Sequence, residues 1–159
     1  MRPARDGKKV PGVLIVNDDP HELDVFALGL RVEGLEAVGT TSAAAALELL
    51  AHDGTDVALI DLMISEINGL ELARSIRLKH PRVITILMSD YLLSPVQLAK
   101  ANTGVVGFVP KPCRFEEVAR FIRGKLESQS AKDGASAAQP HAHSDPQAPF
   151  DVITLHHAS

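Results

Sequence analysis

Short hydrophobic segments recur along the chain, and each is followed by residues whose hydrophobic positions return at helical spacing. Runs that are apolar throughout and rich in valine and isoleucine are typical of strands buried on both faces of a parallel sheet. Four segments have this character, and the segment 35–40 is weaker and more mixed. The pattern therefore predicts strands at 13–16, 35–40, 57–62, 83–88 and 105–109.

The residues between these strands predict helices. A first helix starts at His21 and closes near Gly34, and a second, alanine-rich helix is capped by Thr41 or Ser42. Further helices are predicted at 70–80, 94–101 and 115–126. The alternation indicates an α/β fold: a doubly wound, five-stranded parallel sheet with right-handed crossovers and helices on both faces.

The same pattern predicts the domain organisation. We expect a flexible basic arm at 1–10, one folded domain at 11–128 and a disordered tail at 129–159, which is rich in Ala, Ser, Gln, Pro and His. One apolar island interrupts the tail, at 150–155. It fits either a short docking strand or no element, and the sequence leaves both open.

Composition narrows the class of protein. A chain of 159 residues, 45% hydrophobic, is the size of one domain with a full core. Its net charge of −4 offers no basic stripe for nucleic acid, and no apolar run is long enough to span a membrane. One cysteine, Cys113, excludes an internal disulfide and suits a reducing cytoplasm.

Polar residues follow the predicted strands at their carboxyl ends, which meet at one edge of a parallel sheet. Taken alone, Asp61 fits a turn residue as well as a functional one. Two carboxylates there need a cation, and oxygen ligands suit Mg²⁺, whereas a hydroxyl and a lysine bind an anion. No glycine-rich phosphate cradle is present, so the set favours phosphoryl transfer to a carboxylate over nucleotide binding. The residues are Asn17, Asp18 and Asp19 after the first strand, Asp61 at the third, Ser89 after the fourth and Lys111 after the fifth.

With these residues in place, residues 13–126 resemble the receiver domain of two-component response regulators. The resemblance implies a flavodoxin-like, CheY-like (βα)5 fold and a stand-alone, single-domain type. It rests on an ordered set of motifs: Val16-Asn17-Asp18-Asp19, Asp61-Leu62-Met63, Asn68-Gly69-Leu70, Met88-Ser89 and Gly107-Phe108-Val109-Pro110-Lys111-Pro112.

The resemblance implies roles for the acidic residues. Asp61 would accept a phosphoryl group from a histidine kinase or a histidine phosphotransfer protein. Asp18 would be the direct Mg²⁺ ligand, joined by Asp61, by the backbone carbonyl of Met63 and by Asn17 through a water molecule. The protein would be a signalling domain and not an enzyme acting on separate substrates.

The resemblance also implies a switch. Ser89 would move toward the phosphoryl group, Phe108 would follow it as an aromatic switch, and Lys111 would pair with the phosphoryl oxygens ahead of a cis bond to Pro112. Output would be contact with an unidentified downstream protein through the fourth helix, fifth strand and fifth helix. The protein would be a monomer or a phosphorylation-dependent dimer.

Two departures leave an alternative open. Asn17 stands where the family usually has an acid, and Asp90 replaces a small residue beside the phosphoryl path. A degenerate receiver that binds partners without phosphorylation is therefore a second hypothesis. A third, a phosphatase with an acid two residues after its nucleophile, is disfavoured because Met63 holds that position.

Two further sets of residues are expected to have no redox or metal-binding role. Cys113 follows Pro112 and predicts a half-buried thiol and not a redox centre. The histidines of the tail predict no metal site, because their segment has no structure to gather them: His141, His143, His156 and His157.

Overall fold

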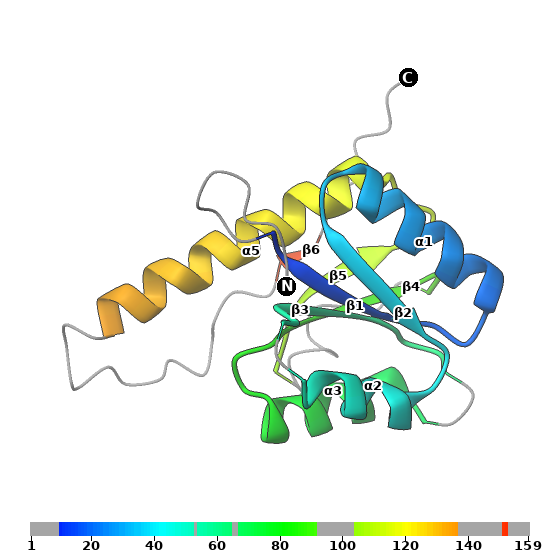
Figure 1. The fold of residues 1–159 in the computed structure, drawn as a ribbon, viewed down its shortest axis with the longest axis horizontal. Helices are drawn as coiled ribbons and strands as arrows, with labels where there is room; N and C mark the ends of the chain where they lie inside the picture. Colours follow the sequence, from blue (N-terminus) through cyan, green and yellow to red (C-terminus); the bar gives the residue numbers. More distant parts are fainter. Residues whose placement is uncertain (1–9, 53, 65–66, 92–103, 137–150, 153–159) are drawn as a thin grey trace.

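The computed structural model describes residues 10–52, 54–64, 67–91, 104–136 and 151–152, which form one parallel sheet with helices on both faces (Figure 1). The strand order is β2-β1-β3-β4-β5-β6. The strands are β1 (Gly12–Val16), β2 (Glu36–Thr40), β3 (Val57–Asp61), β4 (Ile84–Ser89), β5 (Val105–Pro110) and β6 (Asp151–Val152). The helices are α1 (Pro20–Val32), α2 (Ala43–Leu50), α3 (Gly69–Lys79) and α5 (Phe115–Ser136).

The predicted fold class is confirmed. The first five strands follow the order 2-1-3-4-5 of a doubly wound sheet, and each lies within one residue of its predicted ends. Gly34 has a φ of 89° just after α1 and ends that helix as predicted. The helix predicted at 94–101 lies outside the described residues.

Alternation along the strands divides the core into two halves. Val13 and Ile15 of β1 pack beneath α1 and α5, whereas Leu14 and Val16 pack against α2 and α3. Figure 1 shows these helix pairs on opposite sides of the sheet. Because β1, β3 and β4 are buried on both faces, their sequences can be apolar throughout.

The loop after β1 is fixed by the start of α1. Asp19 is the N-cap, and its Oδ1 accepts hydrogen bonds from the backbone N–H groups of His21 (2.9 Å) and Glu22 (3.3 Å). Pro20 occupies the first helical position, where its missing N–H costs nothing. The cap therefore fixes the place where Asn17 and Asp18 leave the sheet.

Helix α5 corrects the predicted boundary near Ser128, because it continues to Ser136. Hydrophobic periodicity stops at Leu126, the last residue of the helix that packs against the core. Beyond it, Gln129 Nε2 donates to the Arg82 carbonyl at 2.9 Å, and the helix projects past the sheet (Figure 1). The pattern thus marked the end of burial and not the end of the helix.

The apolar island at 150–155 contributes a strand, which resolves the alternative left open by the sequence. Asp151 and Val152 form β6, which pairs in parallel with β5 opposite Gly107 and Phe108. A backbone edge that would otherwise offer free N–H and C=O groups is covered there.

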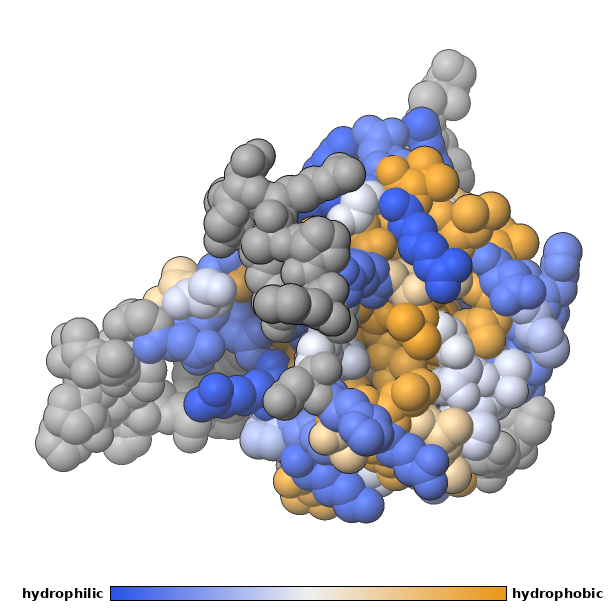
Figure 2. Space-filling view, viewed as in Figure 1, coloured by the Kyte–Doolittle hydropathy of each residue, from blue (hydrophilic) through white to orange (hydrophobic). Residues whose placement is uncertain are grey.

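Helix α1 also carries exposed apolar residues. Val25, Leu28 and Val32 are 44%, 62% and 76% exposed and recur at helical spacing along its outer face. Figure 2 shows hydrophobic residues at the surface over this helix. Contiguous exposed apolar residues are typical of a protein-binding surface.

No helix within the described ranges combines the length and the apolar character needed to cross a membrane.

Removal of residues 137–159 should expose the outer edge of β5. We expect the β5 amides that face β6 to exchange with solvent about five- to tenfold faster, because each lost hydrogen bond contributes about 1 kcal/mol. Hydrogen exchange of the full chain and the truncated chain measures this. Amides of β1 and β3 are the internal control, and unchanged β5 protection would contradict the pairing of β6.

Candidate functional site

The carboxyl edge of the sheet brings three predicted polar residues to one face. Asp61 is the last residue of β3, Asn17 directly follows β1, and Lys111 directly follows β5. Side chains alternate along a strand, so each shares a face with the residue two positions earlier. Those earlier residues all belong to the core beneath α1 and α5: Leu59, Ile15 and Val109.

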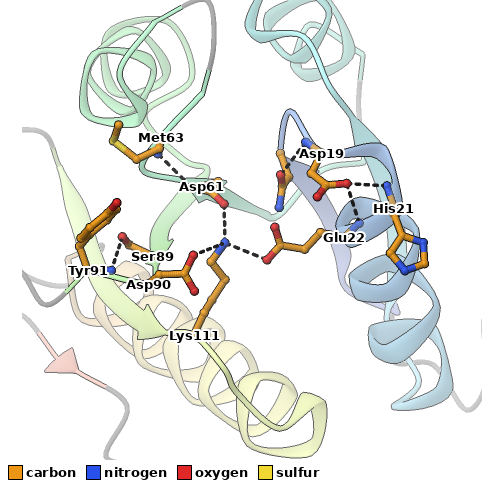
Figure 3. A network of polar contacts seen from close by, with 10 residues as sticks. Asp19, His21, Glu22, Asp61, Met63, Ser89, Asp90, Tyr91 and Lys111 are labelled. Carbon is orange, nitrogen blue, oxygen red and sulfur yellow. Dashed lines mark hydrogen bonds and ion pairs between the residues drawn. The ribbon is translucent and has the colours of Figure 1, made fainter.

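Lys111 and Asp61 form the centre of the site. The Lys111 Nζ donates to Asp61 Oδ2 at 2.7 Å and to Glu22 Oε1 at 2.8 Å (Figure 3). The side chains of Lys111 and Asp61 are only 7% and 8% exposed. Asp90 Oδ2 lies 3.8 Å from the same ammonium, but its side chain is 73% exposed. One buried ammonium therefore serves a buried carboxylate and two more exposed ones.

The charge of Lys111 is secured by these partners. Burial by itself lowers the pKa of the ammonium, but the hydrogen bonds to Asp61 and Glu22 outweigh burial and raise the pKa above its ordinary 10.5. Because the lysine pKa is higher in the folded protein than in the unfolded chain, the charged ammonium stabilises the fold below pH 10.5. This stabilisation is lost only as the pH rises through the pKa of the folded state. Lys111 is thus a fixed cation at neutral pH and not a proton acceptor.

The second oxygen of Asp61 is also engaged. Asp61 Oδ1 accepts a hydrogen bond from the backbone N–H of Met63 at 3.0 Å. Met63 in turn bridges to Asn68 across the loop that follows β3. Both carboxylate oxygens are oriented, so the carboxylate is held at the sheet edge.

The Asn68-Gly69 motif packs α3 against this loop. Asn68 caps α3, because its Oδ1 accepts from the Leu70 N–H at 2.8 Å. A Cβ on Gly69 would lie 2.4 Å from the carbonyl oxygen of Asp61 and 2.9 Å from the Cα of Leu62. Position 69 therefore requires glycine because the helix approaches the backbone of Asp61 itself.

Ser89 and Phe108 lie toward the other face. Ser89 is buried at the end of β4, and its Oγ accepts from the Tyr91 N–H at 2.9 Å. Phe108 is 2% exposed and packs in the core beneath α2 and α3 with Leu87. The hydroxyl hydrogen of Ser89 is not used by the contact with Tyr91, so it can serve an acceptor at the sheet edge.

The loop after β1 contributes an exposed and a buried residue. Asp18 is exposed, whereas Asn17 is 1% exposed and its Oδ1 accepts from the Asp19 N–H at 2.9 Å. The Nδ2 of Asn17 has no hydrogen-bond partner among the described residues. Asp19 caps α1, so its carboxylate is engaged by the first turn of that helix.

The donor set at this edge fits Mg²⁺. Asp18, Asp61 and the Met63 carbonyl offer oxygen atoms alone, and Mg²⁺ usually takes one or two carboxylates and keeps several waters. Within the described ranges, no group of three or more His, Cys, Asp or Glu side chains is placed to hold a metal ion.

Glu22 is a site residue that the sequence analysis missed. It is the acidic residue in the first turn of α1, three positions after the Asp19 cap. The sequence feature that could have identified Glu22 is its position in a helix that starts directly after the Asn17-Asp18-Asp19 loop. Glu22 lies in a helix and not at a strand end, although the first turn of α1 faces the same edge of the sheet.

The structure describes Cys113, the residue predicted to be a half-buried thiol. Cys113 is half-buried, and burial raises the pKa of its thiol to about 11, so little thiolate exists at neutral pH. The bond between Lys111 and Pro112 is cis, as the resemblance implied. The four tail histidines fall outside the described residues.

The fold and the buried acid–lysine pair describe a doubly wound α/β domain with a charged site at the carboxyl edge of its sheet. The sequence match gives the family. The chain belongs to the response regulator receiver domain family, whose model matches residues 13–123. Members of this family are phosphoacceptor modules of two-component signalling and not conventional enzymes, they partner histidine kinases, and they typically bind Mg²⁺.

Curated relatives share the domain but are longer. The chain is 31% identical over 119 residues to the transcriptional regulatory protein GlrR of Escherichia coli, covering 75% of this chain and 27% of that protein. It is 30% identical over 113 residues to the heme response regulator HssR of Staphylococcus aureus, covering 71% of this chain and 50% of that protein. The chain thus spans about a quarter to a half of the length of these relatives.

Solved structures support the fold. A CheY-like receiver domain protein of Methanospirillum hungatei aligns with a TM-score of 0.71 at 24% identity, covering 78% of this chain and 99% of that one. The beryllofluoride-activated DrrB receiver domain aligns with a TM-score of 0.62 at 22% identity, covering 75% and 99%.

Replacing Gly69 with alanine should disturb the site through the backbone of Asp61. We expect the G69A variant to lose about 1–3 kcal/mol of unfolding free energy, because the new methyl group overlaps a strand that is packed on both faces. Chemical denaturation measures the loss.

Gly124→Ala is the matched control. A Cβ there meets no atom within 4 Å, so alanine in the middle of α5 should stabilise the protein by up to about 1 kcal/mol. Equal stability of G69A and the unchanged protein would contradict the close approach of α3.

Proposed function

We propose that the protein is a phosphorelay response regulator that accepts a phosphoryl group on Asp61 from a histidine kinase or histidine phosphotransfer protein. The observation that carries the proposal is the buried contact of Lys111 Nζ with Asp61 Oδ2 at 2.7 Å. It places a fixed cation beside an oriented carboxylate at the edge where ligands of such sheets bind. We expect the protein to act in the cytoplasm, where such donors present their phosphohistidine.

In the proposed reaction an Asp61 oxygen attacks phosphorus while the P–N bond of the phosphohistidine breaks. The bonding electron pair stays on the imidazole nitrogen, and a new O–P bond forms. Lys111 neutralises charge on the phosphoryl oxygens, because its ammonium already lies within hydrogen-bond distance of the acceptor. Bound Mg²⁺, held by Asp18, Asp61 and the Met63 carbonyl, would neutralise further charge on the same oxygens.

The switch follows from the free donor of Ser89. Its hydroxyl can donate to a phosphoryl oxygen on Asp61 while it accepts from the Tyr91 N–H. Movement of Ser89 would alter the end of β4, where Leu87, two residues earlier, pairs with Phe108 on β5. A downstream protein that contacts β5 and α5 would detect this change. The response regulator itself would act either as a monomer or as a phosphorylation-dependent dimer.

The exposed face of α1 supports docking of the phosphoryl donor. Val25, Leu28 and Val32 offer an apolar stripe on the helix whose first turn carries Glu22. A helical partner with an apolar face would cover this stripe and bring its phosphohistidine to the adjacent edge.

A second candidate function is a binding module that is not phosphorylated. The observation that favours it is Asp90, whose Oδ2 lies 3.8 Å from Lys111 Nζ and adds negative charge beside the acceptor. Phosphorylation assays distinguish the two candidates.

Acetyl phosphate with Mg²⁺ should add the mass of one phosphoryl group to the intact protein. Because Asp61 is the acceptor in the proposal, Asp61→Asn should abolish the gain, whereas Asp24→Asn, which removes an exposed carboxylate of α1, should retain it. Intact-protein mass spectrometry measures the product. If the unchanged protein gains no mass, or if the D61N variant still does, the binding-module candidate is favoured.

Replacing Glu22 with glutamine should make Asp61 a better acceptor. The E22Q variant keeps an oxygen for Lys111 but removes a negative charge that shares the ammonium with the incoming group. We expect the rate of phosphorylation at saturating Mg²⁺ to rise roughly fivefold, which corresponds to the ~1 kcal/mol of a partly exposed charge pair.

Glu33→Gln, at the far end of α1, is the matched control and should leave that rate unchanged. An equal or slower rate for E22Q would show that Glu22 does not compete with the phosphoryl group for Lys111.

A further inference from the structure

The side chain of Asn17 is an unsatisfied polar group in the middle of the site. It is 1% exposed, and its Nδ2 has no partner among the described residues. The assignment of its two ends is fixed, because Oδ1 accepts from the Asp19 N–H at 2.9 Å and a reversed amide would oppose two donors. A buried donor without a partner costs free energy and calls for a functional explanation.

Strand pairing places Asn17 beside the acceptor. Val16 of β1 pairs with Ile60 of β3 in parallel, so the next residues, Asn17 and Asp61, leave the sheet side by side. Both continue the face that packs beneath α1 and α5. The carboxamide and the carboxylate therefore share one edge and one face of the sheet.

The unpartnered atom of Asn17 is a donor. Nδ2 offers its N–H groups to no acceptor among the described residues, whereas Oδ1 accepts from the Asp19 N–H and keeps one further lone pair. Asp61 does not satisfy this group: its oxygens accept from Met63 and Lys111, and no hydrogen bond joins them to Nδ2. A phosphoryl group on Asp61 would bring three acceptor oxygens to this edge of the sheet.

We propose that Asn17 is a phosphoryl-binding residue: its Nδ2 donates to an oxygen of the phosphoryl group on Asp61, alongside Lys111. This inference rests on the proposed function of Asp61 and goes beyond the water-mediated metal role that the resemblance implied for position 17. The departure at Asn17 then adds a contact to the anion.

The test uses ¹⁵N-labelled full-length protein with saturating Mg²⁺ and beryllofluoride, which mimics the phosphoryl group. The Asn17 side-chain N–H₂ resonances should shift downfield in the adduct and show coupling to ¹⁹F, because a fluorine takes the place of the accepting oxygen. A purely structural role in the loop would leave these resonances unmoved.

Asn17→Asp supplies the matching affinity measurement. The new carboxylate can still accept from the Asp19 N–H, but the donor is lost. At saturating Mg²⁺ we expect beryllofluoride to bind about tenfold more weakly or worse, as for loss of a hydrogen bond to a charged group. Without beryllofluoride, Mg²⁺ should bind no more weakly than before.

Asn68→Asp is the control, because it makes the same chemical change at an exposed asparagine whose Oδ1 also accepts from a backbone N–H. It should leave beryllofluoride affinity unchanged. Equal or tighter binding by N17D, or an adduct in which the Asn17 resonances do not move, would overturn the inference while the proposed function stands. If the unchanged protein forms no adduct, both fail.

Discussion

The ion pair between Lys111 and Asp61 sets the geometry that the rest of the site depends on. Two charges this deeply buried are tolerable only if they meet with good geometry. Their strands, β3 and β5, are separated by β4, so the lysine must cross roughly 10 Å of sheet edge. The intervening strand ends at Ser89, and the backbone N–H of Lys111 donates to the Ser89 carbonyl at 2.9 Å. The parallel sheet is thus the frame that holds the two charges together.

Sharing of the same ammonium ties α1 to the sheet edge. Glu22 reaches Lys111 because Asp19 caps α1 and fixes the rotation of its first turn. An anion that arrives at Asp61 must therefore share Lys111 with a carboxylate that belongs to a different element. The site couples three parts of the chain through the side chain of Lys111. A change of charge at Asp61 should therefore alter the contact of Lys111 with Glu22 in α1 as well as the position of Lys111 at the end of β5.

The sequence predicted the features that follow from local pattern and from the rule that parallel strands end at one edge. Apolar runs placed the five strands, and that rule alone brought Asp61 and Lys111 together. Glu22 was missed because its contact depends on the rotation of a helix, which only the cap and the packing determine. The end of α5 was misplaced because its polar residues form a helix without a core to impose periodicity.

The acidic residues around Asp61 are distributed differently from the usual family pattern. An acid is absent at Asn17, beside the expected metal ligands, and acids are present at Glu22 and Asp90, beside Lys111. Compared with the usual family pattern, a negative charge is missing beside the expected metal ligands. Negative charges are present instead beside Lys111, where they compete with a phosphoryl group for the ammonium. Since a phosphoryl group needs positive partners, an added donor at position 17 would compensate for a lysine that is already shared. In the proposed function, position 17 would offer the phosphoryl group a hydrogen-bond donor where the family usually offers the metal an acid.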